Sequence, residues 1–328
     1  MAAPVGVGSV LDGRFRITSL LSEGNVSTVY EAVDRSTGQV VAIKMPVGSS
    51  ERDPLYLERF RREEAIGGAL QHPSVIRVFP VERKSRPYLV MEKVGGAPLS
   101  TRLQVGHPLP MGEVLRIGIQ IARALEYLHE QQVVHRDLKP SNIMVFPDGS
   151  IRVIDLGIAK RGEEPEFGGT LGSQPLGTPD YMPPEQVRGE SGDPRSDIYS
   201  LGAMLYEMAT GVPPFQGDDV FYVLHARVVG DPVPPRTLNP ELSPELEEVL
   251  LHALERDPAR RYRSMTVFRQ ELEHPDGVAV TGRRDRVRPP GFWGIFWRRI
   301  RDFVWAMAAI ISFFGVMIAV AWKWGRHR

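Results

Sequence analysis

The chain contains no cysteine among its 328 residues. This absence excludes disulfide bonds and cysteine–zinc sites, so a metal ion would need oxygen or histidine ligands. The chain also has no net charge, because 40 Lys/Arg balance 40 Asp/Glu. What it does have is an apolar fraction of 42%, which is ample for a sizeable core and rules out a disordered chain.

The balance of charge conceals two parts of opposite sign. Residues 274–328 contain ten Lys/Arg but only three Asp/Glu, whereas the residues before them are acidic overall. An acidic body argues against a nucleic-acid-binding protein, and a basic tail suits an anionic surface. We therefore expect no nucleic acid among the partners of the chain.

A long uncharged stretch lies inside this tail. Residues 303–322 contain no charged side chain, and as a helix they would span about 30 Å, the thickness of the hydrocarbon core of a bilayer. We expect one transmembrane helix here, followed by a short extracytoplasmic tail over 323–328. A buried helix of a soluble domain is the alternative interpretation. Seven arginines between 283 and 301 precede the stretch, so the positive-inside rule places residues 1–302 in the cytoplasm and the protein in the inner or plasma membrane.

The apolar pattern divides the body into two lobes. Over residues 14–94, short alternating stretches separated by Gly, Asn and Ser predict an antiparallel sheet, with one helix over 54–70. Beyond Gly95-Gly96, over residues 95–273, the apolar residues recur mostly at helical spacing. The expected fold class is therefore α+β, with a small β-rich lobe before a larger helical lobe.

Turn and capping residues place the elements of the helical lobe. The turn at 147–149 is expected to join two short strands, and Ser243 and Ser264 are expected helix starts. An N-terminal segment over 1–13 precedes the lobes, and a basic juxtamembrane linker over 274–302 follows them. The expected helices lie at about 196–210, 217–228, 243–255 and 264–273.

One motif carries the chemistry of the chain. Residues 135–142 read HRDLKPSN, and Asp155-Leu156-Gly157 follows thirteen residues beyond Asn142, at the end of an expected strand. A match at this many positions of one eight-residue window is far less probable by chance than a match at any single residue. The pattern predicts a phosphotransferase, because the transfer of a phosphoryl group requires alignment of the reactants and neutralisation of crowded negative charge.

Each residue type fits one part of that chemistry. Asp137 is expected to accept the proton of the attacking hydroxyl, and Lys139 to stabilise the charge on the moving phosphate. Asn142 and Asp155 are oxygen ligands suited to Mg²⁺, with Mn²⁺ as an alternative. Lys44, in VAIK, is expected to bind the phosphates of ATP. The competing interpretation is that these residues only occupy turn, capping or surface positions. The full set of spacings disfavours it.

The motifs VAIK, HRDLKPSN and DLG, in this order, resemble the Hanks-type protein kinases, specifically the bacterial serine/threonine branch. The resemblance covers roughly residues 14–273. It implies a two-lobed kinase that transfers the γ-phosphoryl group of ATP to protein substrates. Lys139 and the pair Gly177-Thr178 resemble the serine/threonine enzymes, which implies Ser or Thr acceptors.

The resemblance also implies structural anchors in the helical lobe. GTPDYMPPE resembles the end of a kinase activation segment, although Pro183 stands where the family usually has Ala. Asp197 corresponds to the residue that braces the catalytic loop. Arg261 corresponds to the arginine that pairs with the glutamate of the activation segment, here Glu185.

At the nucleotide site, the resemblance selects Glu63 over Glu64 as the partner of Lys44, and Met91 as the gatekeeper before the backbone that meets adenine. A solvated position on the helix surface is the competing interpretation of Glu63. The residues expected at ATP are Leu21, Ser22, Glu23, Gly24, Asn25, Val26, Ser27, Thr28, Val29, Ala42, Lys44, Glu63, Glu92 and Val94.

The phosphate loop departs from the family pattern. LSEGNVSTVY keeps only Gly24, with Ser22 and Ser27 at the other two glycine positions. Glycine lets a backbone approach phosphates and adopt positive φ, so each serine restricts the loop. We expect weakened rather than abolished ATP binding. The alternative hypothesis is a pseudokinase, which would act as a nucleotide-binding scaffold or a signalling adaptor.

Regulation is a further expectation from the resemblance. In the family, the arginine at the position of Arg136 often meets a phosphate on the activation segment. The candidate sites here are Thr170 and Ser173, and we expect autophosphorylation, above all at Thr170, followed by a charge-assisted pair with Arg136. Kinases of this kind often pair through their small lobes, so a homodimer through the N-lobe is also a candidate.

Overall fold

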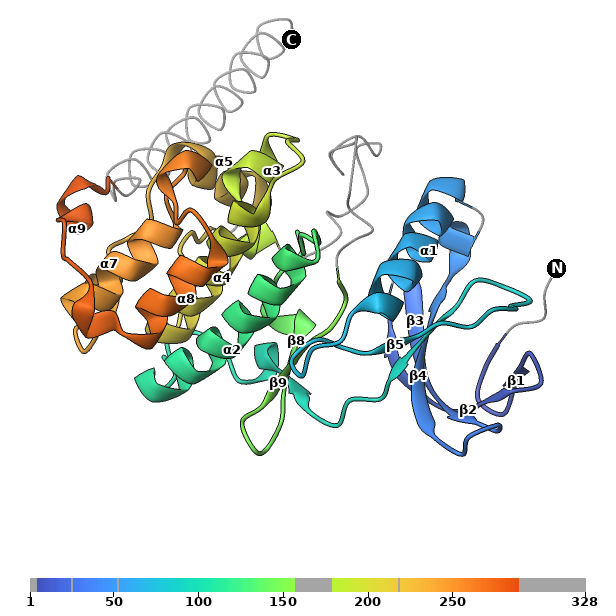
Figure 1. Ribbon diagram of the computed structural model, residues 1–328. Coiled ribbons are helices and arrows are strands. Elements are labelled where there is room, and N and C mark those ends of the chain that lie inside the picture. Colours follow the sequence, from blue (N-terminus) through green and yellow to red (C-terminus); the bar gives the residue numbers. More distant parts are fainter. Residues whose placement is uncertain (1–4, 25, 52, 157–178, 218, 289–328) are drawn as a thin grey trace, which may run out of the picture.

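The protein folds into two lobes (Figure 1). The computed structural model describes residues 5–24, 26–51, 53–156, 179–217 and 219–288. A curled antiparallel sheet and one long helix form the N-terminal lobe, and helices form most of the C-terminal lobe. The expected α+β class, with a small β-rich lobe before a larger helical lobe, is confirmed.

The N-lobe sheet has the strand order β1-β2-β3-β4-β6-β5, with every neighbouring pair antiparallel. Alternation along β4 sends Ile43 to the core on one face, and Ala42 to the face covered by helix α1. Lys44 comes two residues after Ala42 and therefore points toward α1. The strands are β1 (Val10–Leu11), β2 (Phe15–Glu23), β3 (Ser27–Asp34), β4 (Val40–Pro46), β5 (Val78–Phe79) and β6 (Leu89–Glu92).

Helix α1 (Pro54–Ala69) starts and packs for local reasons. The Asp53 side chain accepts hydrogen bonds from the N–H groups of Leu55 and Tyr56, and proline is tolerated at the first helical position. Near its end, a Cβ at Gly67 would lie only 2.7 Å from Val78 Cγ2, so glycine lets α1 approach β5 closely. Strand β5 is short because Pro80, which has no N–H, follows it.

The C-lobe surrounds one large apolar core. Residues at helical spacing in α2, including Ile117, Ile121 and Leu125, are fully buried, and α4 is buried along most of its length. The helices are α2 (Met111–Glu130), α3 (Pro184–Val187), α4 (Pro194–Thr210), α5 (Val220–Val229), α6 (Pro235–Leu238), α7 (Pro244–Ala253), α8 (Met265–Glu273) and α9 (Arg283–Arg286). Short 3-10 helices are η1 (Gly48–Glu51), η2 (Leu99–Thr101), η3 (Pro140–Asn142), η6 (Pro179–Tyr181), η7 (Pro258–Arg260) and η8 (Pro275–Gly277).

Two expected helix starts are confirmed. The Ser243 hydroxyl accepts from the N–H of Leu246 at the start of α7, and the Ser264 hydroxyl accepts from the N–H of Val267 at the start of α8. Helix α5 begins later than expected, because Asp219 provides its N-terminal cap. The expected pair of strands around the turn at 147–149 is β8 (Ile143–Val145) and β9 (Ile151–Val153), joined by β7 (Ala97–Pro98) in a small sheet between the lobes (Figure 1).

Within the described ranges, which end at residue 288, no helix is both long and apolar enough to cross a membrane. The expected span over 303–322 and the tail over 323–328 lie outside the described residues.

The first half of the expected linker packs on the C-lobe. Arg283 of α9 forms ion pairs with Glu248 and Glu255, and Arg284 forms one with Glu247. The N–H of Arg288 donates to an Asp231 carboxylate oxygen at 2.9 Å. Carboxylates of α7, together with Glu255 and Asp231, therefore hold residues up to 288 against the domain, rather than leaving them extended in solvent.

This packing predicts a stability effect. Arg283→Ala should lower the melting temperature by about 3 °C, because it leaves the largely buried Glu248 without an ion-pair partner, at a cost of about 1 kcal/mol. Differential scanning fluorimetry measures the shift. Arg286→Ala is the matched control, since the exposed Arg286 side chain donates to the Thr281 hydroxyl rather than to a carboxylate. Equal melting temperatures for the two variants would contradict the interpretation.

Candidate active site

Lys44 joins the two lobes through ion pairs. Its Nζ lies 3.1 Å from Glu63 Oε1 on α1 and 2.6 Å from Asp155 Oδ1, just beyond β9. The neighbouring Glu64 points elsewhere and pairs with Lys84. Successive residues of a helix point about 100° apart, so only one of the two glutamates can face the sheet. The structure thus places Glu63, the expected partner, beside Lys44.

The charges of this cluster set its protonation. Attraction to Lys44 lowers the pKa of Asp155 to about 2. Burial alone would lower the pKa of Lys44, but the two carboxylates raise it above its ordinary value. Burial raises the pKa of Glu63, and the attraction of Lys44 opposes that rise. Near neutral pH, Lys44 is a cation and Asp155 an anion. The Asp155 side chain is 46% exposed, which leaves it accessible to a ligand.

The motif loop, residues 135–142, is held in place by a buried carboxylate on α4. Asp197 accepts hydrogen bonds from the N–H groups of His135 and Arg136, both at 2.9 Å, and lies 2.7 Å from His129 Nε2. Burial would raise the pKa of Asp197, but these hydrogen bonds keep it below its ordinary value. Arg136 has φ of 63°, a conformation that a non-glycine residue adopts only when its surroundings impose it.

Asp137, Lys139 and Asn142 converge within this loop. Lys139 Nζ lies 2.9 Å from Asp137 Oδ2, and Asn142 Nδ2 donates to the Asp137 carbonyl at 2.9 Å. The N–H of Ile154 donates to the carbonyl of Asn142 at 2.8 Å, which ties the loop to the residue before Asp155. Asn142 and Asp155, the two expected metal ligands, are therefore close in the fold. Their amide and carboxylate oxygens have the hard-donor chemistry that Mg²⁺ prefers.

The phosphate loop connects β2 and β3. Ser22 pairs with Val29 in the ladder between the two strands, and Ser27 pairs with Pro46 of β4. Neither serine is among the described residues with positive φ. The N–H of Gly24 donates to the carbonyl of Ser27 at 3.0 Å. Both serines therefore occupy strand conformations that do not require glycine. Asn25 lies outside the described residues.

The expected adenine-binding residues lie where β6 leaves the N-lobe. Ala42 and Met91 are opposite each other in the β4–β6 pair, and both are buried. The N–H of Glu92 donates to Arg77, and its carboxylate pairs with Arg152, so the side chain of Glu92 is a link between the lobes. Within the described ranges, the N–H of Val94 donates to no other group, so it is available to a ligand.

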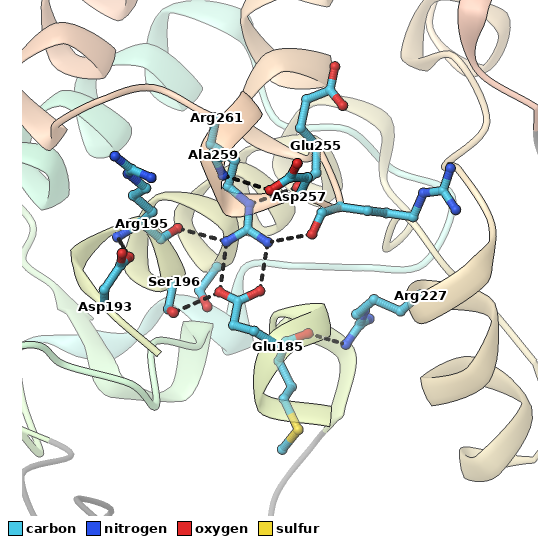
Figure 2. Close-up of polar contacts among 12 residues, drawn as sticks. Glu185, Asp193, Arg195, Ser196, Arg227, Glu255, Asp257, Ala259 and Arg261 are labelled. Carbon is cyan, nitrogen blue, oxygen red and sulfur yellow. Dashed lines mark hydrogen bonds and ion pairs between the residues drawn. The ribbon is translucent and has the colours of Figure 1, made fainter. Parts of the chain in front are cut away.

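The C-terminal end of the GTPDYMPPE segment is anchored in the C-lobe. Glu185 and Arg261 form two parallel hydrogen bonds, at 2.8 and 2.7 Å, and both side chains are buried (Figure 2). Such bidentate pairs are strong and geometrically specific. Gln186 Nε2 donates to the carbonyl of Arg136 at 3.2 Å, which connects this segment to the motif loop. Thr170, Ser173 and the pair Gly177-Thr178 lie outside the described residues.

Residues 15–275 match the model of the protein kinase domain. The chain belongs to the protein kinase family. Kinases of this family generally use ATP and a divalent metal ion. Lys44, Asp137, Asn142 and Asp155 all lie within the matched residues.

The chain is also similar to individual proteins of this family. A probable serine/threonine-protein kinase of Streptomyces coelicolor is 38% identical over 268 residues, which is 80% of this chain and 40% of the relative. The serine/threonine-protein kinase PknB of Mycolicibacterium smegmatis is 36% identical over 267 residues, covering 80% of this chain and 43% of the relative. The chain thus matches about two fifths of the length of these relatives. The crystal structure of the Mycobacterium tuberculosis PknI kinase domain is similar with a TM-score of 0.66, at 25% identity, over 84% of this chain and 100% of that one.

The structure also shows two arginines with contacts that the sequence did not predict. Arg227 of α5 is fully buried beside the GTPDYMPPE segment, and Arg152 pairs with Glu92 across the lobes. No local motif marks either arginine, because each acts on a partner that is distant in the sequence.

Proposed function

We propose that this chain is a serine/threonine protein kinase, which transfers the γ-phosphoryl group of ATP to Ser or Thr hydroxyls of protein substrates. The observation that carries the proposal is the cluster of Lys44, Glu63 and Asp155, which joins the lobes beside the motif loop. The similar proteins of Streptomyces coelicolor and Mycolicibacterium smegmatis are named as serine/threonine kinases, which supports the choice of acceptor.

Each residue of the site has a proposed role. The Asp137 carboxylate accepts the proton of the acceptor hydroxyl and orients its oxygen toward the phosphorus. Lys139, which lies 2.9 Å from Asp137, stabilises the negative charge of the transferring group. Glu63 orients the ammonium group of Lys44 toward the phosphates. Asn142 and Asp155 would hold the Mg²⁺ or Mn²⁺ ion, which supplies positive charge to neutralise the phosphates.

The proposed nucleotide site extends from the phosphate loop to the C-terminal end of strand β6. The loop over residues 21–29, with Gly24 at its tip, covers the phosphates; Ala42 contacts the adenine ring, and the backbones of Glu92 and Val94 bind its polar edge. The buried Met91 behind them would limit the depth of the site.

One experiment tests the proposal against the pseudokinase alternative. The full chain in detergent is incubated with labelled ATP, Mg²⁺ and a histone mixture, and labelled protein is counted. We expect label on the histones. ATP binding without any transfer would instead support a nucleotide-binding scaffold. The strand conformations of Ser22 and Ser27 favour an active enzyme, because neither serine occupies a backbone conformation that requires glycine.

We further propose autophosphorylation at Thr170 or Ser173, with the phosphate pairing with Arg136. The backbone of Arg136 is fixed by Asp197, and its carbonyl accepts from Gln186, the residue after the GTPDYMPPE segment. Its Nη2 donates to the Gly192 carbonyl at 3.3 Å. Phosphopeptide mapping after incubation with Mg-ATP is expected to find a phosphate on Thr170. An unmodified 157–178 segment in an active enzyme would contradict this prediction.

The location of the enzyme is also a proposal. We infer a single-pass protein of the inner or plasma membrane, anchored in the lipid bilayer through residues 303–322, with the kinase domain at 14–273 in the cytoplasm and residues 323–328 on the other side. The absence of charge across 303–322 supports the anchor. Fractionation of the full chain and of a chain lacking 303–328 tests it. Analytical ultracentrifugation tests the proposed homodimer through the N-lobe.

A further inference from the structure

Arg227, near the end of α5, is a buried cation with an unusual set of partners. Its side chain is 0% exposed, although arginine is rarely buried without a specific reason. Its Nη2 donates to the carbonyl of Asp180 at 2.6 Å, and its Nη1 donates to the carbonyl of Met182 at 3.0 Å. The guanidinium also lies 5.5 Å from the centre of the Phe215 ring. The two donor atoms thus bind the backbone carbonyls on either side of Tyr181.

Tyr181 itself is held from α4. The Ser200 hydroxyl donates to the Tyr181 carbonyl at 2.8 Å, and the Tyr181 hydroxyl donates to the carboxylate of Glu207. Three successive carbonyls, those of residues 180–182, therefore each accept a hydrogen bond from a buried side chain of α4 or α5. The position of this backbone depends on those side chains, because residues 180–182 belong to no sheet.

A second arginine holds the same segment at its other end. Arg261 pairs with Glu185, and its guanidinium lies 4.8 Å from the ring centre of Tyr199. Figure 2 shows Arg261 above Glu185 and Arg227 to its right, so the two arginines reach this part of the chain from different directions. Arg261 fixes a side chain, whereas Arg227 fixes the backbone three to five residues earlier in the chain.

Residues 180–182 lead directly into α3, which contacts the catalytic loop. Gln186 of α3, four residues after Met182, donates to the carbonyl of Arg136, and Arg136 directly precedes Asp137. A displacement of residues 180–182 would therefore shift the chain that leads into this contact with the catalytic loop, without touching the Lys44 cluster between the lobes.

We infer that Arg227 is a positioning residue for the protein acceptor: it holds the backbone of residues 180–182 as the surface on which the acceptor segment lies beside Asp137. This inference rests on the proposed kinase function. Arginine suits the role because its rigid planar fork can donate to two carbonyls at once, whereas a lysine ammonium is a point charge on a flexible stem.

The test compares acceptor kinetics with ATP kinetics in the full chain. For Arg227→Met, the KM for a histone mixture should rise about tenfold, because two hydrogen bonds from a charged donor are lost. The KM for ATP and the rate of ATP hydrolysis without acceptor should stay within about twofold of wild type. Arg227→Lys, which retains the charge and is the more conservative change, should give an intermediate KM for histone.

The matched control is Arg256→Met. Arg256 also donates to a backbone carbonyl, that of Val229 at the end of α5, but it does not touch residues 180–182. Its KM for histone should equal that of wild type. An unchanged KM for histone in Arg227→Lys and Arg227→Met would overturn the inference. A parallel loss of ATP hydrolysis would also overturn it, because the role would then be merely structural. A wild-type chain that neither hydrolyses ATP nor labels histone would overturn the proposed function itself.

Discussion

Replacement of Asp137 by asparagine is expected to reduce phosphoryl transfer to protein by about 10²- to 10⁴-fold, the range associated with a general base. Asparagine has nearly the same shape, but its amide cannot accept the proton of the acceptor hydroxyl. The hydrogen bond from Asn142 Nδ2 to the Asp137 carbonyl uses the backbone of Asp137, not its carboxylate, and should persist. The loop should therefore remain folded while the transfer rate falls. Transfer of label from ATP to histone measures the effect.

ATP binding separates a chemical defect from a folding defect in this variant. Asp137→Asn should bind ATP with nearly wild-type affinity, because the Lys44 cluster does not include Asp137. The control is Asp148→Asn, which changes an aspartate in the turn between β8 and β9 that accepts from the N–H and hydroxyl of Ser150. That variant should transfer phosphate at the wild-type rate. Full activity of Asp137→Asn would exclude Asp137 as the base.

Replacement of Arg261 by methionine should destabilise the C-lobe by about 3–5 kcal/mol, the cost of leaving a buried charge without its partner. The side chains of Arg261 and Glu185 are 0% and 3% exposed, so water cannot replace the lost hydrogen bonds. For a domain of this size, the melting temperature should fall by about 10 °C. Arg260→Met, at a neighbouring side chain that is 74% exposed, is the control and should change it little.

The double variant Glu185→Gln/Arg261→Met identifies the cause of this loss. Removal of the carboxylate charge as well should restore part of the stability, because the penalty arises from the unpaired anion. Hydrogen bonds and the charge of Arg261 lower the pKa of Glu185 against the effect of burial. The stabilisation from the pair is therefore present above the ordinary pKa of glutamate, and is lost as the pH falls through the depressed value. Strictly additive single changes would contradict this account.

Much of the fold could be predicted from residue patterns. Alternation in the first lobe and helical spacing in the second predicted an α+β protein of two lobes, and Ser243 and Ser264 marked helix starts that the structure contains. Exact ends were less predictable: α5 begins at Val220 because Asp219 caps it, and β5 ends where Pro80 removes a donor. Local caps decide such boundaries, and several residues nearby could have provided them.

For the candidate site, the spacing of HRDLKPSN, DLG and VAIK was enough to name Lys44, Asp137, Asn142 and Asp155. Each of these residues lies in a short motif, so the spacing within the motif is enough to identify it. The choice between Glu63 and Glu64 rested on resemblance. The fold places Glu63 toward the sheet, because the axial rotation of α1 relative to β4 depends on packing along the whole helix.

By itself, the sequence determined the family, the two lobes and the catalytic loop, because these features depend on residues close together in the chain. Only the tertiary structure decided that Lys44 contacts Asp155, 111 residues away, that Arg227 holds residues 180–182, and that Arg283 ties the start of the basic tail to α7. Each of these contacts joins elements brought together by the packing of a common core. No short-range pattern encodes that packing.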